Sequence, residues 1–479
     1  MKQEGSLDMK VCLIVEGSYP YVTGGISGWL QQMLMELKDI EFSILAIKAS
    51  RNENMEFKYK IPQNVTEIKN IYLLDDDYIS NSRKKIRLSR KEYEAFQSLF
   101  FGEDVNWSTI FDFFKQESIS INQILGGYDF LKMTKAYYSM KYNRVIFSDF
   151  LWTMRSIYLP LFMILKSGAY PADLYHSLST GYAGIIGSMQ KSIFMKPFII
   201  SEHGIYTRER EEEIIKASWV NEVYKDIWIQ QFKKISNCCY QKADVVTSLF
   251  KGARELQIEL GCPKDKTQII PNGVNISDFS NLPKNEKDES INIGAILRVT
   301  PIKDVKTMIT AFSIAKGKND KLKLWIMGPL DESPQYAKEC KDLVEDLQVK
   351  DVIFTDKVNV KDYIGKMDML VLSSLSEGQP LSILEGFAAK KPYITTNVGN
   401  CYGLLYGEQD TYGDAGIVVP PMNVEKMGEA MLKIANDEIL RKKMGEAGYQ
   451  RVANHHDNKE VLKQYRDLYS FVIEKERRK

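Results

Sequence analysis

Short apolar runs bounded by turn residues recur along the chain and alternate with stretches of helical periodicity. The first run, Lys10 to Val15, is bounded by Gly17 and Pro20, which predicts a buried strand. A Gly-rich turn then leads into a predicted helix at 27–38, and a second strand is predicted at 42–47. This strand–loop–helix–strand order is typical of the start of a doubly wound parallel sheet.

The alternation is interrupted once and then continues almost to the end of the chain. Residues 51–150 are rich in aromatic and charged side chains, and we predict a mostly helical insertion there. Further strands are predicted at 173–177, 197–201, 244–248, 291–297, 322–327, 352–355, 368–373, 393–396 and 417–419. Helices are predicted at 305–316, 335–347, 381–389, 424–435, 439–453 and 458–473.

A turn-rich segment, Pro271 to Asn275, and the polar run 281–290 separate two such series. At 479 residues the chain is too long for one core, so we expect two α/β domains. We place them at 1–273 and 274–453, with 454–479 forming a helix that crosses back to the first domain. Ligands of open α/β sheets bind at the carboxyl ends of the strands, so two facing doubly wound domains would share a cleft between them.

Composition narrows the class of protein. Apolar residues make up 44% of the chain and charged residues 27%, as in globular proteins. Lys and Arg total 64 and Asp and Glu 63, a net charge of +1, which argues against a nucleic-acid partner. No apolar run reaches the roughly 18 residues of a membrane-spanning helix, so we expect no direct membrane span.

The expected location is the cytoplasm. The first residues, MKQEGSLDMK, lack the layout of a secretory signal. The six cysteines are scattered without metal-type spacing, as expected for a reduced protein. Any recruitment to the inner face of the membrane is therefore expected to run through other proteins.

Two cations follow the strand predicted at 291–297. Arg298 and Lys303 lie between that strand and the next helix. Arg offers a planar fork and Lys a point charge, so together they suit a diphosphate. The alternative is an ordinary loop whose basic residues face solvent.

A second candidate segment, SEGQPLSILEG, follows the strand at 368–373. Its Gly-Gln-Pro turn opens a helix, and backbone N–H groups at a helix start can bind an anion. The residues of this turn and first helical turn are Gly378, Gln379, Pro380, Leu381 and Ser382. Glu385, about one turn inside, is suited to a ribose diol, and Glu377 on the loop to sugar hydroxyls. The alternative is that both carboxylates are simply solvated.

The chain has four histidines, of which two come at predicted strand ends. His203 follows the strand at 197–201, and His176 lies in the strand at 173–177. We consider a functional and a structural role equally for His203 and favour a structural one for His176. His455 and His456, in a polar break, are predicted to lie on the surface.

Two remaining features bear on phosphate and metal binding. Gly24 and Gly25 open the first helix like a phosphate cradle, although a full GxGxxG pattern is missing. Asp75 to Asp77 form an acidic run that we interpret as a solvated loop in preference to a metal site. Because cations and a helix start supply the countercharge, we expect no metal and no cofactor.

Together these segments resemble glycosyltransferase family 4, retaining enzymes of the GT-B fold. The resemblance covers most of 270–455. It rests on PNGVN, the pair Arg298 and Lys303, Met327-Gly328-Pro329, Val352 to Thr355, and SEGQPLSILEG. Two N-terminal segments, 16–25 and 201–210, look like those of Pel-type exopolysaccharide glycosyltransferases, which extends the resemblance over nearly the whole chain.

This resemblance implies a cytosolic transferase that moves a hexose from a UDP-sugar, such as UDP-glucose, to a growing polysaccharide. By the same analogy the diphosphate binds to Arg298 and Lys303, the ribose to Glu385 and the donor sugar to Glu377. His203 would lie beside the reacting end of that sugar and Phe354 near the nucleobase. The family's Phe-Thr-Gly is Phe-Thr-Asp here, ending at Asp356, which weakens the analogy near the base.

Two alternatives remain open. A sugar-nucleotide epimerase shares the two-domain fold and would release free hexosamine without an acceptor. A non-catalytic scaffold of a membrane-bound polysaccharide synthase would bind partners without turnover.

Overall fold

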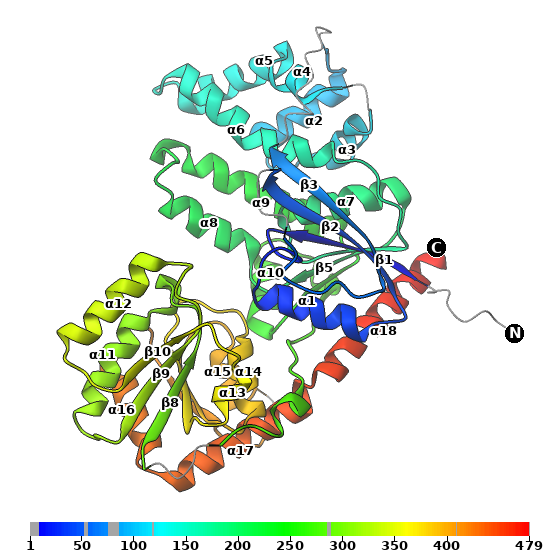
Figure 1. The fold of residues 1–479 in the computed structure, drawn as a ribbon. Coiled ribbons are helices and arrows are strands. Elements are labelled where there is room, and N and C mark those ends of the chain that lie inside the picture. The colour runs from blue at the N-terminus through cyan, green and yellow to red at the C-terminus, as the bar shows by residue number, and fades with distance from the viewer. Residues whose placement is uncertain are drawn as a thin grey trace, which may run out of the picture. The chain divides into compact units, whose positions relative to one another are not determined.

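The computed structural model describes residues 9–51, 56–74, 86–116, 119–284, 289–408 and 410–478. The chain divides into two compact units (Figure 1). Unit 1 consists of Met1–Ile269 with Tyr465–Lys479, and unit 2 of Ile270–Gln464. The acidic run at 75–77 lies outside the described residues.

Unit 1 contains a parallel sheet of seven described strands in the order β3-β2-β1-β4-β5-β6-β7. The strands are β1 (Lys10–Glu16), β2 (Glu41–Ser50), β3 (Val65–Leu74), β4 (Leu174–Ser177), β5 (Phe198–Glu202), β6 (Val245–Ser248) and β7 (Thr267–Ile269). Their apolar runs are buried because helices cover both faces of a parallel sheet. β3 lies within the segment predicted to be mostly helical, and neither β3 nor β7 was predicted.

The helices of unit 1 include a block, α2 to α6, that gathers beside β3 (Figure 1). The bounds are α1 (Gly25–Glu36), α2 (Arg90–Phe101), α3 (Trp107–Phe114), α4 (Ile121–Leu125), α5 (Tyr128–Tyr137), η2 (Tyr138–Tyr142), α6 (Phe147–Leu165), α7 (Gly181–Phe194), α8 (Tyr206–Lys216), η3 (Glu222–Tyr224), α9 (Lys225–Lys242), α10 (Lys251–Glu259) and η4 (Lys264–Lys266). Aromatic contacts hold the block together: the rings of Phe100 and Tyr158 stack 4.3 Å apart. Its apolar side chains join the same core as those of the sheet, so the insertion is an integral part of unit 1.

Unit 2 contains a second parallel sheet, of six described strands, in the order β10-β9-β8-β11-β12-β13. The strands are β8 (Ile291–Ile296), β9 (Leu322–Met327), β10 (Val352–Asp356), β11 (Met369–Leu372), β12 (Tyr393–Thr396) and β13 (Gly416–Val419). The helices are η5 (Ile276–Phe279), η6 (Pro301–Lys303), α11 (Val305–Lys316), α12 (Pro334–Asp346), α13 (Lys361–Ile364), α14 (Leu381–Ala388), α15 (Cys401–Tyr406), α16 (Val424–Ala435), α17 (Glu438–His455) and α18 (Asn458–Arg477), the last of which ends in unit 1.

Helices cover both faces of this second sheet. Figure 1 shows α11, α12 and α16 on one face and α13, α14 and α15 on the other. The predicted pair of doubly wound parallel sheets is therefore confirmed. No helix within the described residues combines the length and the apolar character that crossing a membrane requires.

The end of β10 carries a backbone conformation that favours glycine. Asp356 has φ +58°, in the left-handed region, and its carbonyl accepts a hydrogen bond from the N–H of Gly328 at 3.1 Å. A glycine would adopt this φ without strain, whereas a side chain there is sterically strained. The Asp356 carboxylate accepts from the Lys357 N–H at 2.8 Å, which helps aspartate to occupy the position.

We expect Asp356→Val to lower the free energy of unfolding by about 1–2 kcal/mol, because a β-branched side chain is unsuited to the left-handed region. Asp356→Gly should change it by no more than about 0.5 kcal/mol. Urea denaturation of both variants measures this difference. Equal midpoints for the two variants would show that the backbone relaxes away from the left-handed conformation.

Candidate functional site

The strand order of unit 2 reverses at one place. From β8 the chain proceeds to β9 and β10 on one side, and from β11 to β12 and β13 on the other. β8 and β11 are direct neighbours, so the loops at their carboxyl ends meet at a topological switch point, where open α/β sheets bind ligands. These two loops carry the cations and the glutamate motif predicted from the sequence.

The loop after β8 is short and tightly held. Its 3₁₀ turn η6 ends at Lys303, and Asp304, with φ +45°, caps α11 by accepting from the Thr307 N–H at 3.4 Å. The neighbouring strand end contains Gly328, with φ +152°. A Cβ at Gly328 would lie 1.9 Å from the Leu297 carbonyl oxygen, so only glycine allows the two loops to approach this closely.

Lys303 and Glu377 form an ion pair that joins the two loops at the switch point. Their side chains are 16% and 11% exposed, so the pair is largely removed from water. Ser374 Oγ donates to the same Glu377 oxygen at 2.5 Å, and Ser373 Oγ donates to the Lys303 carbonyl at 2.7 Å. The structure thus brings together a cation and a carboxylate that lie 74 positions apart in the sequence.

The segment after Glu377 is fixed by two further contacts. Gly399, with φ +52°, packs so closely that a Cβ would lie 2.3 Å from the Glu377 carbonyl oxygen. Asn400 N–H donates to the Gly378 carbonyl at 2.9 Å. Gln379 is only 5% exposed, and its side-chain oxygen accepts from the Asn272 N–H at 2.6 Å. The Gln379 side chain therefore anchors the PNGVN segment, and the Gln379 backbone carbonyl accepts from Asn272 Nδ2 at 3.1 Å, so the backbone N–H is the group left for the predicted anion contact.

Helix α14 begins at Leu381, with Pro380 in an extended conformation as its N-cap. Leu381 and Ser382 in its first turn are partly buried. Glu385 follows, and burial raises the pKa of its carboxyl group from 4.5 to about 7, against the opposing charge of Lys361. No side chain within the described residues forms a hydrogen bond or ion pair with Glu385. A ligand that reaches its carboxyl group would therefore displace no side-chain bond, and the group changes its protonation near neutral pH.

Two other predicted donor contacts lie nearer the surface of unit 2. Arg298 is exposed and its Nη1 lies 2.8 Å from the Glu332 carboxylate, so it pairs with a different carboxylate from Lys303. Phe354, in β10, is half-buried against the core, with Lys341 Nζ 5.9 Å from its ring centroid.

The N-terminal candidates meet in unit 1. α1 begins at Gly25, after Gly24 with an extended φ of 170°. A Cβ at Gly24 would meet no atom within 4 Å, so nothing in the chain's own packing requires glycine there. The same helix supplies Trp29, whose ring lies 4.6 Å from that of His203. The structure therefore brings His203, directly after β5, against the helix that the two glycines open.

The other histidines are structural or peripheral. His176 is fully buried, its Nδ1 lies 2.7 Å from Tyr469 Oη and its Nε2 2.8 Å from Ser201 Oγ. Burial, with a smaller contribution from His203, lowers the pKa of His176 to about 3, so it stays neutral. The surface prediction for His456 is wrong. It is buried and bonds the Asn272 carbonyl at 2.9 Å, because the break before α18 packs against the PNGVN segment.

Sequence reasoning missed three residues that hold this site: Ser374, Asn272 and Gly399. Ser374 could have been found from its position directly after a buried strand. Asn272 and Gly399 could not, because they contact the segment 377–379 only once the chain has folded. Among the described residues no group of three or more His, Cys, Asp or Glu side chains could hold a metal ion. The expectation of a metal-free reaction stays a prediction.

Two families match successive parts of the chain. "Domain of unknown function (DUF3492)" matches residues 9–265, and "Glycosyl transferases group 1" matches residues 277–451. The second match contains every predicted residue of unit 2 from Arg298 to Glu385.

Curated relatives are distant. A poly(ribitol-phosphate) alpha-N-acetylglucosaminyltransferase of Staphylococcus aureus is 24% identical over 42% of this chain and 40% of its own length. The chain thus spans less than half of that relative. The capsular polysaccharide biosynthesis glycosyltransferase CapM of Staphylococcus aureus is 23% identical over 66% of this chain and 83% of its own length.

Solved structures share the fold over nearly the whole chain. Anabaena HepE in complex with UDP and glucose has a TM-score of 0.61 at 14% identity, covering 96% of this chain and 99% of that one. Sucrose-phosphate synthase from Thermosynechococcus elongatus has a TM-score of 0.62 at 16% identity, covering 97% and 99%. The two Rossmann-like sheets are those of the GT-B fold. Because one family match spans more than half of its length, the chain belongs to the family described as "Domain of unknown function (DUF3492)", with a glycosyl transferases group 1 domain at residues 277–451.

Proposed function

We propose that the protein is a UDP-sugar-dependent glycosyltransferase that extends a polysaccharide. The observation that carries this proposal is the switch point of unit 2, where the largely buried pair Lys303 and Glu377 joins the loops after β8 and β11. A cation there suits a leaving diphosphate, and a carboxylate suits the hydroxyls of the donor sugar. Glu385, without a side-chain partner among the described residues, suits the ribose.

The finer features of the proposal rest on resemblance. Segments 16–25 and 201–210 resemble the Pel exopolysaccharide glycosyltransferase PelF, which supports UDP-glucose or a related UDP-hexose as donor. Family 4 chemistry supports transfer with retention, without metal, through stabilisation of the leaving phosphate. Of the two curated relatives named above, one is a poly(ribitol-phosphate) transferase and the other a glycosyltransferase of capsular polysaccharide biosynthesis, which supports a polysaccharide acceptor. A membrane-bound synthase at the cytoplasmic face is the partner proposed with it.

Calorimetric titration of the protein with UDP, GDP, ADP and NAD tests the donor site. We expect selective binding of UDP. Binding of NAD alone, or of none of the four, would contradict the transferase. Release of free hexosamine from a UDP-sugar without acceptor would favour the epimerase, and UDP-sugar binding without transfer would favour the scaffold.

Arg298→Ala should weaken UDP binding about tenfold or more, since a charge-assisted hydrogen bond contributes roughly 1.5–3 kcal/mol. Glu332→Ala is the matched control. It removes the present partner of Arg298 and should leave UDP affinity unchanged or higher. Unchanged UDP binding by Arg298→Ala would remove Arg298 from the site.

A further inference from the structure

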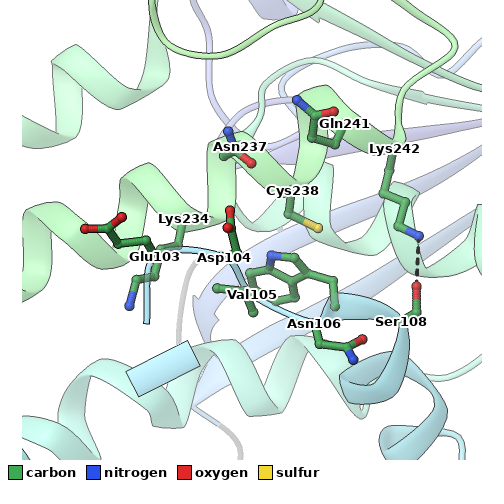
Figure 2. A pocket seen from close by; sticks show the side chains of 11 residues that line it. Glu103, Asp104, Val105, Asn106, Ser108, Lys234, Asn237, Cys238, Gln241 and Lys242 are labelled. Carbon is green, nitrogen blue, oxygen red and sulfur yellow. Dashed lines mark hydrogen bonds between the residues drawn. The ribbon is translucent and has the colours of Figure 1, made fainter. Parts of the chain in front are cut away.

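Unit 1 contains a crevice that the donor site does not use. It has a volume of about 520 Å³, within the ~300–1,000 Å³ range of small-molecule sites. One wall is the segment 103–108, which leads from α2 into α3. The other wall is one face of α9, and Figure 2 shows the two walls on opposite sides of the crevice.

The α9 wall is built by helical spacing. Lys234, Asn237, Cys238, Gln241 and Lys242 recur at intervals of three and four, so they share one face of the helix. Cys238 is buried and forms the apolar back of the crevice. Of the polar side chains on this face, Lys234, Gln241 and Lys242 bond to other groups of the chain, and Asn237 is exposed.

The helices on either side of the facing segment, α2 and α3, are both bonded to α9. Lys234 Nζ donates to the Leu99 carbonyl at 2.8 Å, and Lys242 Nζ donates to Ser108 Oγ at 3.3 Å, as the dashed line in Figure 2 marks. Burial lowers the pKa of Lys234 to about 8. The crevice is thus formed where the insertion packs against α9, and both lysines of its lining already donate hydrogen bonds within the chain.

Several hydrogen-bonding groups of the crevice are unused within the described chain. The carboxylates of Glu103 and Asp104 have no ion-pair partner there, and the side chain of Asn237 makes no hydrogen bond. The indole N–H of Trp107, a lining residue, also has no partner among the described residues. Carboxylate and amide groups accept and donate hydrogen bonds to hydroxyl groups.

The charged side chains that line the crevice indicate which class of ligand it can bind. The carboxylates of Glu103 and Asp104 would repel an anion such as phosphate, and the lysines would repel a polyamine. A neutral, polyhydroxylated ligand can bond to groups of both signs. We propose that this crevice binds a neutral segment of the polysaccharide acceptor. The inference rests on the proposed function, which supplies a polysaccharide as acceptor.

The test is calorimetric titration with three neutral probes, cellotetraose, maltotetraose and chitotetraose, on the full chain. Asp104→Ala/Asn237→Ala should weaken the binding of at least one tetraose about tenfold or more, because two hydrogen bonds are lost. Both side chains are exposed and make no hydrogen bond within the described chain, so the variant should fold. Asn122→Ala, an exposed residue of α4 outside the crevice, should bind like the parent protein.

UDP titration of the same samples separates this inference from the proposed function. UDP affinity should be equal in all three proteins. If UDP binds normally but no tetraose binds, or the double variant binds tetraose as the parent protein does, the proposed saccharide site is wrong and the proposed function stands. Preferential binding of inorganic phosphate or spermidine in the crevice would contradict the proposal that its ligand is neutral. Absence of UDP binding by the parent protein would overturn the proposed function and this inference with it.

Discussion

Lys303→Ala is expected to lower the rate of sugar transfer about 10²–10³-fold, the effect of removing one preorganised charge-stabilising donor from an active site. Lys303 is the cation that the fold holds at the switch point, in a largely buried pair with Glu377. In the proposed reaction the leaving UDP gains negative charge in the transition state, and a positive charge already in place stabilises it without reorganisation. The measurement is the initial rate with saturating UDP-sugar.

The same substitution should also affect stability, because it leaves the Glu377 carboxylate buried without its cation. Breaking a buried ion pair costs about 3–5 kcal/mol. Lys303→Ala/Glu377→Ala removes the unpaired charge and should recover much of this loss, while transfer stays low. Recovery of stability without recovery of transfer would show that lower stability is not the cause of the lost transfer.

Lys306→Ala is the matched control for charge. Lys306 lies on α11, three positions on, and pairs with Glu339 at 2.6 Å near the surface. Transfer by this variant should stay within about twofold of the parent rate, as for an exposed ion pair that contributes little. A Lys303→Ala rate within threefold of the parent rate would mean that Lys303 serves only to hold Glu377.

The parts of the fold that the sequence predicts are those whose signal is local. A buried parallel strand is a continuous apolar run, so β1, β9 and β12 could be located to within about one residue. β3 could not, because it is the edge strand of its sheet and most of its residues are partly exposed. Its mixed pattern, VTEIKNIYLL, has neither a continuous apolar run nor strict alternation.

In the candidate site, too, the sequence predicts local features and not contacts between distant segments. The cations and glutamates could be named from their positions after strands, but their pairing could not. Arg298 and Lys303 are five positions apart and pair with Glu332 and Glu377, because Arg298 faces the surface and Lys303 the switch point. Which loop meets which depends on strand order, and strand order follows from packing across the whole sheet.

Glu385 should make UDP-glucose binding depend on pH between 5.5 and 8. Burial raises the pKa of its carboxyl group to about 7, so the group carries a proton below that pH. A protonated carboxyl accepts hydrogen bonds from a ribose diol more weakly than a carboxylate does. Affinity should therefore rise with pH, by up to about tenfold per unit below pH 7, and level off above it.

The stability of the ligand-free protein should change in the opposite direction. In the unfolded chain Glu385 ionises near its ordinary pKa of 4.5, whereas in the folded chain it ionises near 7. The unfolded state therefore loses its proton first, and the free energy of unfolding falls as pH rises from about 4.5 to 7. With 1.36 kcal/mol per pKa unit, the contribution is about 3 kcal/mol.

Glu385→Gln is the variant that tests both effects, because glutamine keeps the shape and does not titrate. Its stability relative to the parent protein should grow between pH 4.5 and 7, while its affinity for UDP-glucose should be low at every pH. The diphosphate of UDP-glucose is esterified at both ends and does not titrate in this range, so a pH dependence belongs to the protein. Glu345→Gln, at an exposed position of α12, should behave like the parent protein. Parallel pH profiles of UDP-glucose affinity for the parent protein and Glu385→Gln would show that Glu385 does not hold the ribose. A gain of stability in Glu385→Gln together with a loss of binding would show that the fold keeps a destabilising carboxyl group because the ligand needs it.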